Sequence, residues 1–158
     1  MNTTTEKPSL TFYHANAKRT GGAVKFALCP ATAETDGHIS LTLANQTAEG
    51  LPRFDWQNAI TVKLDFVEVC KVLQVLRGEC ESIDDGRGTF HRSPRHATVF
   101  VFRHVVEPVS CYSLEVSQRD METGAVASSR FVLTMPEAIG VCCSLEQSMG
   151  VLAFGKEA

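Results

Sequence analysis

Twice along this chain, a group of strand-like segments is followed by one helix-like segment. Alternation of apolar and polar residues predicts half-buried strands at 38–46 and 60–64. From Asp65 to Leu76 the apolar residues recur at spacings of three and four, which indicates an amphipathic helix. A second helix is predicted over 136–152. Because most links between strands are of hairpin length, this order predicts an α+β fold with two antiparallel β-sheets, each followed by a helix (β-β-β-α repeated).

The other strands are predicted from β-prone segments that lie between turn signals. They cover 10–13, 23–29, 89–92, 97–106, 112–118 and 128–134, with a further short strand at 79–82. The helix ends carry signals of their own. Asp65 is a suitable N-cap, Gly78 a natural stop, and Pro136 fits the first turn of the second helix.

The length of 158 residues predicts one domain, here 10–155, preceded by a flexible N-terminal tail at 1–9. The chain has no run of 18 apolar residues, and its polar N-terminus has no apolar stretch of the kind found in signal peptides. We therefore predict a cytoplasmic protein.

The six cysteines form no C-x-x-C pair, which argues against a zinc site. Without secretion disulfides are not expected either, so the thiols are predicted to be buried and reduced. The motifs G-x-S-x-G and H-E-x-x-H are absent. We predict that the protein is not an enzyme and needs no metal or cofactor, with a Cys-dependent enzyme as a minor alternative.

Residues 86–106 carry four arginines and three histidines and no acidic residue, although the chain as a whole has a net charge of −3. Positive charge interleaved with aromatic rings is typical of surfaces that bind phosphates and stack bases. The alternative is an exposed hairpin whose arginines only maintain solubility, with acidic residues just before it neutralising part of the charge. The binding candidates are Arg87, Phe90, His91, Arg92 and Arg95.

A second set of candidates lies nearer the N-terminus. Lys18, Arg19 and Lys25 flank a Gly-Gly pair, which would let backbone amides approach a phosphate closely. Phe54 and Trp56 lie in a loop beside a strand and are candidates for base stacking. The alternatives are a plain turn for the first group and a small plug of the core for the aromatic pair.

Five short motifs follow one another along the chain between about Phe12 and Phe154. They are Gly22-Ala-Val-Lys-Phe26, Phe54-Asp-Trp56, Gly78-Glu-Cys-Glu81, Phe90-His91 and Val106-Glu-Pro108. Their order resembles that in the Whirly family of single-stranded-DNA-binding proteins, and more distantly that in the single-strand-binding transcriptional coactivators. The lysines of the family's first-strand motif are not reproduced in register.

The resemblance implies two sheets that stand like blades against a helical core, with single-stranded DNA across the sheet edges. It further implies a homo-oligomer, a tetramer, in which the second helix forms the interface. Partial burial between subunits is then expected for Cys142, Cys143, Leu145 and Met149. The predicted function is single-stranded DNA binding with little sequence specificity, in DNA metabolism or transcription regulation. The alternatives are RNA binding, or a protein-interaction module on the same fold.

Overall fold

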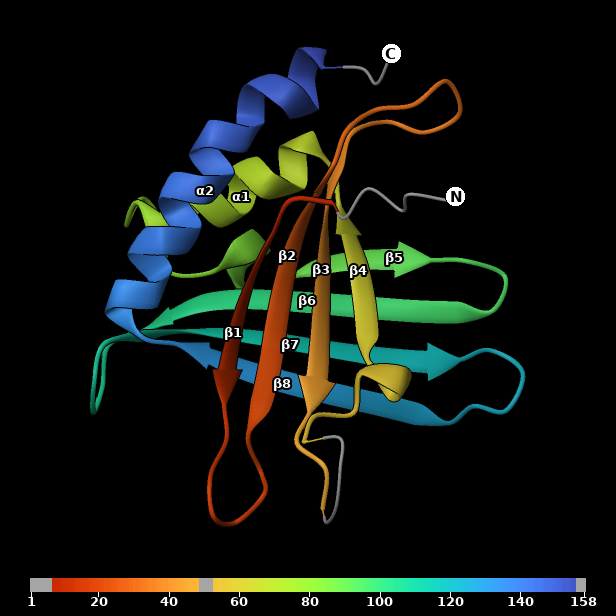
Figure 1. The fold of residues 1–158 in the computed structure, drawn as a ribbon, viewed down its shortest axis with the longest axis vertical. Coiled ribbons are helices and arrows are strands. Elements are labelled where there is room, and N and C mark those ends of the chain that lie inside the picture. Colours follow the sequence, from red (N-terminus) through yellow and green to blue (C-terminus); the bar gives the residue numbers. More distant parts are fainter. Residues whose placement is uncertain (1–6, 49–52, 156–158) are drawn as a thin grey trace, which may run out of the picture.

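The computed structural model describes residues 7–48 and 53–155 and contains two four-stranded antiparallel sheets and two long helices (Figure 1). Each sheet is followed by a helix, which confirms the predicted α+β fold with two antiparallel sheets, although each sheet has four strands and not the three of the predicted β-β-β-α repeat. The first half comprises β1 (Ser9–His14), β2 (Gly22–Cys29), β3 (His38–Asn45), β4 (Ile60–Leu64) and α1 (Phe66–Leu76). The second half comprises β5 (Thr89–Arg92), β6 (His96–Val105), β7 (Cys111–Asp120), β8 (Val126–Leu133) and α2 (Met135–Phe154).

Both sheets contribute one apolar face to a common core. Because successive side chains of a strand point to opposite faces, the register assigns every residue to a side. In the first sheet Val24, Leu43 and Ile60 face the core. In the second sheet Phe102 and Leu114 do so, and all five belong to one cluster of buried side chains. The outer faces of the two sheets therefore point away from each other.

Both helices begin with a reciprocal capping arrangement that their sequences encode. The Asp65 carboxylate accepts the Glu68 N–H at 2.8 Å, and the Glu68 carboxylate accepts the Asp65 N–H at 3.2 Å. Thr134 and Glu137 do the same for α2. Two backbone donors are thereby satisfied at each helix start. The first helix begins where it was predicted, whereas the second starts and ends slightly outside its predicted limits.

The same two glutamates connect the halves of the molecule. His14, at the end of β1, has its Nε2 2.9 Å from a carboxylate oxygen of Glu137 at the start of α2. His91, in β5, lies 2.5 Å from Glu68 in α1. Each half thus attaches the first strand of its sheet to the helix start of the other half. These contacts place the edge strands of both sheets firmly against the helices.

The prediction of a short strand at 79–82 is wrong. Only an isolated bridge joins Ser82 to Arg103, and the chain then enters a 3₁₀ turn, η2 (Ile83–Gly86). Ile83 is buried in the core, while Asp84 and Asp85 adopt left-handed φ values of 48° and 55°. Ser82 is itself extended, but η2 begins directly after it, so the pairing with β6 stops at one bridge.

The tail predicted at 1–9 lies mostly outside the described residues. Of its last residues, the Pro8 carbonyl accepts the Leu28 N–H at 2.9 Å, and Ser9 begins β1. Within the described part of the chain, neither helix combines the length and apolar character that crossing a membrane requires.

Candidate nucleic-acid interface

The outer side of the first sheet carries two exposed aromatic rings that lie against each other. Tyr13 of β1 is 59% exposed and Trp56 is 37% exposed. Their ring centroids are 6.4 Å apart in an edge-to-face arrangement. Beneath them Phe54 is only 6% exposed and lies 5.5 Å from the Tyr13 ring. The Tyr13 ring thus contacts both the accessible Trp56 and the buried Phe54, which support its position.

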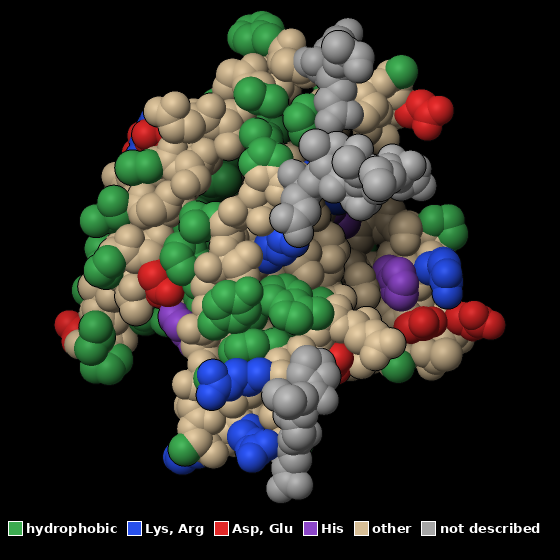
Figure 2. Space-filling view, in the orientation of Figure 1, with side chains coloured by type: hydrophobic (Ala, Val, Ile, Leu, Met, Phe, Trp, Pro, Cys, Tyr) green, Lys and Arg blue, Asp and Glu red, His purple; other side chains and the backbone are tan. Residues whose placement is uncertain are grey.

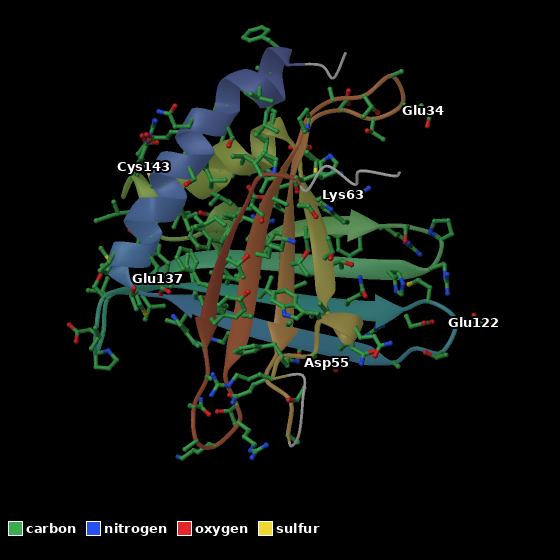
Figure 3. All side chains as sticks on the ribbon, in the orientation of Figure 1. Glu34, Asp55, Lys63, Glu122, Glu137 and Cys143 are labelled. Atoms are coloured by element: carbon green, nitrogen blue, oxygen red, sulfur yellow. The ribbon has the colours of Figure 1, made fainter. Side chains whose placement is uncertain are left out.

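The segment after β3 explains how Trp56 reaches this surface. Gln46 pairs with Phe54 in an isolated bridge, which aligns the returning chain with the end of β3. A short 3₁₀ helix, η1 (Trp56–Asn58), follows, and the Asp55 side chain accepts the Asn58 N–H at its start. The Asp55 carboxylate, labelled at the lower end of the sheet in Figure 3, also accepts from the Asn58 amide. This cap therefore fixes the backbone at Trp56. It also occupies the carboxylate of Asp55, the residue before Trp56, in hydrogen bonds.

Cationic side chains share this outer side. Lys25 lies opposite Thr11 and Thr42 in the register, and Lys63, labelled in Figure 3, lies opposite Ser40. Lys18 and Arg19 are exposed in the β1–β2 hairpin. Figure 2 shows this side of the molecule, with hydrophobic side chains in its centre and Lys or Arg side chains around them. We call the surface formed by Tyr13, Trp56, Lys18, Arg19, Lys25 and Lys63 the first-sheet face.

The first-sheet face has four cationic side chains and a nearby acid, Asp55, whose carboxylate hydrogen-bonds within η1. Among the described residues, no ion pair joins any of its four cations to a carboxylate. The strands beneath contribute hydroxyls and small side chains, and Thr42 and Thr61 hydrogen-bond to each other at 3.0 Å. A flat surface of this kind offers phosphate partners and ring faces side by side.

The outer side of the second sheet holds a separate group of predicted residues. Phe90 is 61% exposed and lies opposite Val99, and Arg92 lies opposite Ala97. Across the sheet, Arg119 faces Ala97 from β7. These residues line an open groove of about 370 Å³, which we call the second-sheet groove. Its lining consists of Phe90, Arg92, Ala97, Val99, Ser117, Arg119, Met121 and Val126.

The structure therefore divides the predicted site into two surfaces on opposite sides of the subunit. Lys18, Arg19, Lys25 and Trp56 belong to the first-sheet face. Phe90 and Arg92 line the second-sheet groove. Arg95 lies in the β5–β6 turn beside the groove, where its carbonyl accepts the Met121 N–H. Arg87 is exposed directly after η2.

Two of the predicted residues, Phe54 and His91, make other contacts within the fold. Phe54 is buried, so its ring supports Tyr13 and has no free face for a base. His91 points to the inner side of β5, where it pairs with Glu68, whereas its neighbours Phe90 and Arg92 point outward. Glu68 lies in a helix, 23 positions before His91 in the chain. The absence of acidic residues from 86–106 therefore gave no indication of this pairing.

Sequence inspection missed Tyr13, Lys63 and Arg119. A signal existed for Lys63, because the alternation from Ile60 to Leu64 places it on the side opposite the core residues. Tyr13 had no comparable signal, since its partner Trp56 is far away in the chain and approaches it only through the η1 segment. Arg119 joins the groove through pairing of β7 with β6.

The prediction that the thiols are buried holds only for Cys29, because Cys80 and Cys143 are exposed and the other three are half-buried. Burial, followed by the nearby Glu146 carboxylate, raises the pKa of the Cys142 thiol, which keeps it protonated. In the described ranges, no three His, Cys, Asp or Glu side chains gather in a way that could hold a metal ion.

The outward side of α2 exposes apolar residues. Ile139 is 64% exposed, and Cys143, labelled in Figure 3, and Phe154 are exposed as well. Leu145 is buried in the core of its own subunit, so its predicted place between subunits is incorrect. Cys142 and Met149 are half-buried against the same core.

No protein-family model and no curated protein matches this chain. Solved structures do. The WHY1 protein of Arabidopsis thaliana matches with a TM-score of 0.74 at 15% identity, over 93% of this chain and 85% of that one. The plant transcriptional regulator PBF-2 matches with a TM-score of 0.69 at 15% identity, over 94% and 85%. A guide-RNA-binding protein complex bound to a guide RNA matches with a TM-score of 0.67 at 14% identity, over 95% and 94%. The predicted resemblance to Whirly proteins is thereby confirmed for the fold.

Proposed function

We propose that this chain, which has the Whirly fold, is a single-stranded-nucleic-acid-binding protein whose principal contact surface is the first-sheet face. One observation carries the proposal: Tyr13 and Trp56 are exposed side by side on a sheet surface whose lysines have no ion pair among the described residues. Lys18, Arg19, Lys25 and Lys63 neutralise phosphates, while the two rings stack on bases. Stacking is tolerant of sequence, so little sequence preference is expected.

The likeness to solved structures supports a nucleic-acid ligand, which could be single-stranded DNA or RNA. One of the structural neighbours is bound to a guide RNA, and another is a transcriptional regulator. We propose single-stranded DNA, with a role in DNA metabolism or transcription regulation, and keep RNA as the alternative. Anisotropy measured with a labelled DNA strand, the matching RNA strand and the duplex separates these possibilities. Absence of binding to all three at low salt would leave a protein-interaction module as the function.

Loss of Lys25 and Lys63 should weaken binding in a salt-dependent manner. Each phosphate contact to a single strand contributes about 0.7 to the slope of log K against log[salt], because neutralised phosphates release counterions. The double variant Lys25→Ala/Lys63→Ala is therefore expected to bind less tightly and to show a shallower slope across a salt series. Lys71→Ala serves as a matched control, since Lys71 lies on α1, where its ammonium pairs with the Asp84 carboxylate. An unchanged slope would exclude both lysines from the contact surface.

We also propose a homo-oligomer, a tetramer, assembled through the outward side of α2. Support comes from exposed Ile139 and Phe154, because large apolar side chains on a helix commonly mark an interface. Ile139→Asp is expected to shift the mass in solution toward smaller species, whereas Val126→Asp, on the outer side of the second sheet, should leave it unchanged. A wild-type protein that is monomeric at all concentrations would refute this assembly.

A further inference from the structure

We infer that the second-sheet groove is a second binding site for single-stranded nucleic acid, separate from the first-sheet face, so that one subunit holds two strand segments. This inference rests on the proposed function and adds to it a second contact surface. The groove combines an exposed ring at Phe90 with cationic side chains at Arg92 and Arg119. These are the chemical groups that a base and its flanking phosphates require.

The groove is shaped for one flat ring between charged groups. Phe90 of β5, Val99 of β6 and Ser117 of β7 follow one another across the sheet in the hydrogen-bonded register. The next row on the same face is Arg92, Ala97, Arg119 and Val126. The two arginines are thus separated by a small alanine, which leaves room between them. A base stacked on Phe90 would have a guanidinium from this neighbouring row within reach of its phosphate.

The charge of the groove is not neutralised by its surroundings. None of the lining residues is acidic, and among the described residues neither Arg92 nor Arg119 forms an ion pair. Two acids, Asp120 and Glu122, lie in the adjacent β7–β8 hairpin, and among the described residues neither pairs with an arginine of the groove. The Asp120 carboxylate accepts the N–H groups of Glu122 and Thr123, and Glu122 lies at the tip of the hairpin (Figure 3). The Thr123 amide, followed by that of Glu122, lowers the pKa of Asp120, as expected for a carboxylate occupied within its own turn.

The second-sheet groove cannot be an extension of the first-sheet face within one subunit. The inner sides of both sheets share one core, so their outer sides point in opposite directions. A strand bound to Tyr13 and Trp56 would have to pass around a sheet edge to reach Phe90. The orientation of the sheets therefore makes the two surfaces separate within one chain.

The test counts short strands per chain. Titration of the full-length protein with a labelled oligothymidylate of about six nucleotides, a length within the range of a single-strand site, should saturate at two per chain. The variant Arg92→Ala/Arg119→Ala should saturate at one and retain the tighter event. The variant Lys25→Ala/Lys63→Ala should lose the tighter binding event, which the arginine variant retains. Arg77→Ala is the matched control, since Arg77 pairs with Glu146 between the helices, and its stoichiometry should remain at two.

The outcomes distinguish this inference from the proposed function. Saturation at one strand per chain, with no effect of the arginine variant, would overturn the second site and leave the function intact. Loss of all binding in either double variant would show one continuous site and would also overturn it. No binding by the wild-type protein would contradict the function itself. Because Arg92 and Arg119 are exposed, thermal melting should be unchanged in their variant; Phe90→Ala provides a second, uncharged probe of the same groove.

Discussion

Replacing Tyr13 and Trp56 together by alanine is expected to weaken binding of a single-stranded oligonucleotide about 100-fold. Stacking on an aromatic side chain contributes roughly 1–3 kcal/mol per base, and each 1.4 kcal/mol is a factor of about ten in affinity. Both rings are accessible and adjacent, so one strand can use them together. The slope of affinity against salt should stay constant, because no phosphate contact is removed. Fluorescence anisotropy across a salt series measures both quantities.

Phe154→Ala is the control for this experiment. Its ring is 89% exposed at the end of α2, so its removal tests whether any exposed aromatic residue matters. Phe54→Ala answers a different question, because that ring is buried beneath Tyr13. It should lower thermal stability and weaken binding only through displacement of Tyr13. Affinity of the Tyr13/Trp56 double variant within a factor of two of wild type, with an intact fold, would remove the rings from the proposed contact surface.

Gly88→Ala should destabilise the protein strongly, by about 3 kcal/mol. Gly88 has a φ of 76°, a left-handed value that costs other residues about 1–2 kcal/mol. In addition, a Cβ at this position would lie 2.2 Å from the Phe100 carbonyl oxygen in the neighbouring strand. Overpacking of this kind adds about 1–3 kcal/mol. For a domain of this size the melting temperature should fall by about 10 °C.

Gly124→Ala is the matched control for the crowding effect. Gly124 has a similar φ of 73° in the β7–β8 turn, but a Cβ there would meet no atom within 4 Å. Only the backbone cost of about 1–2 kcal/mol should remain. Calorimetry of both variants separates the two contributions. Equal losses of stability would show that β5 moves to accommodate the added carbon at position 88.

Much of the architecture could be predicted from residue patterns, because local periodicity and end signals act within a few residues. The alternation at 60–64 and the spacing of three and four after Asp65 correspond to β4 and α1 as observed. The capping partners of Asp65 lie within one turn, so this helix start was visible as well. The prediction failed at 79–82, where the turn at Ile83–Gly86 ends the pairing with β6 after one bridge.

The candidate site was less predictable, since charge patterns record neighbours in sequence and not neighbours in space. The absence of acids from 86 to 106 suggested one continuous cationic surface. In the folded chain, Glu68 from α1 engages His91, and Glu115 from β7 approaches Arg103 to 3.5 Å. Strand alternation then sends Phe90 and His91 to opposite sides of the same strand. His91 is thereby directed away from the outer surface that Phe90 and Arg92 share.

The amino-acid sequence by itself determined which segments become strands and helices, how each helix starts, and which residue types are available to meet a phosphate or a base. Only the tertiary structure decided which of those side chains share a surface. Packing of both sheets on one core turned their outer faces apart and divided the candidates between the first-sheet face and the second-sheet groove. The physical reason is that hydrogen bonding and steric preference act locally along the chain, whereas burial of apolar faces joins segments that are distant in it.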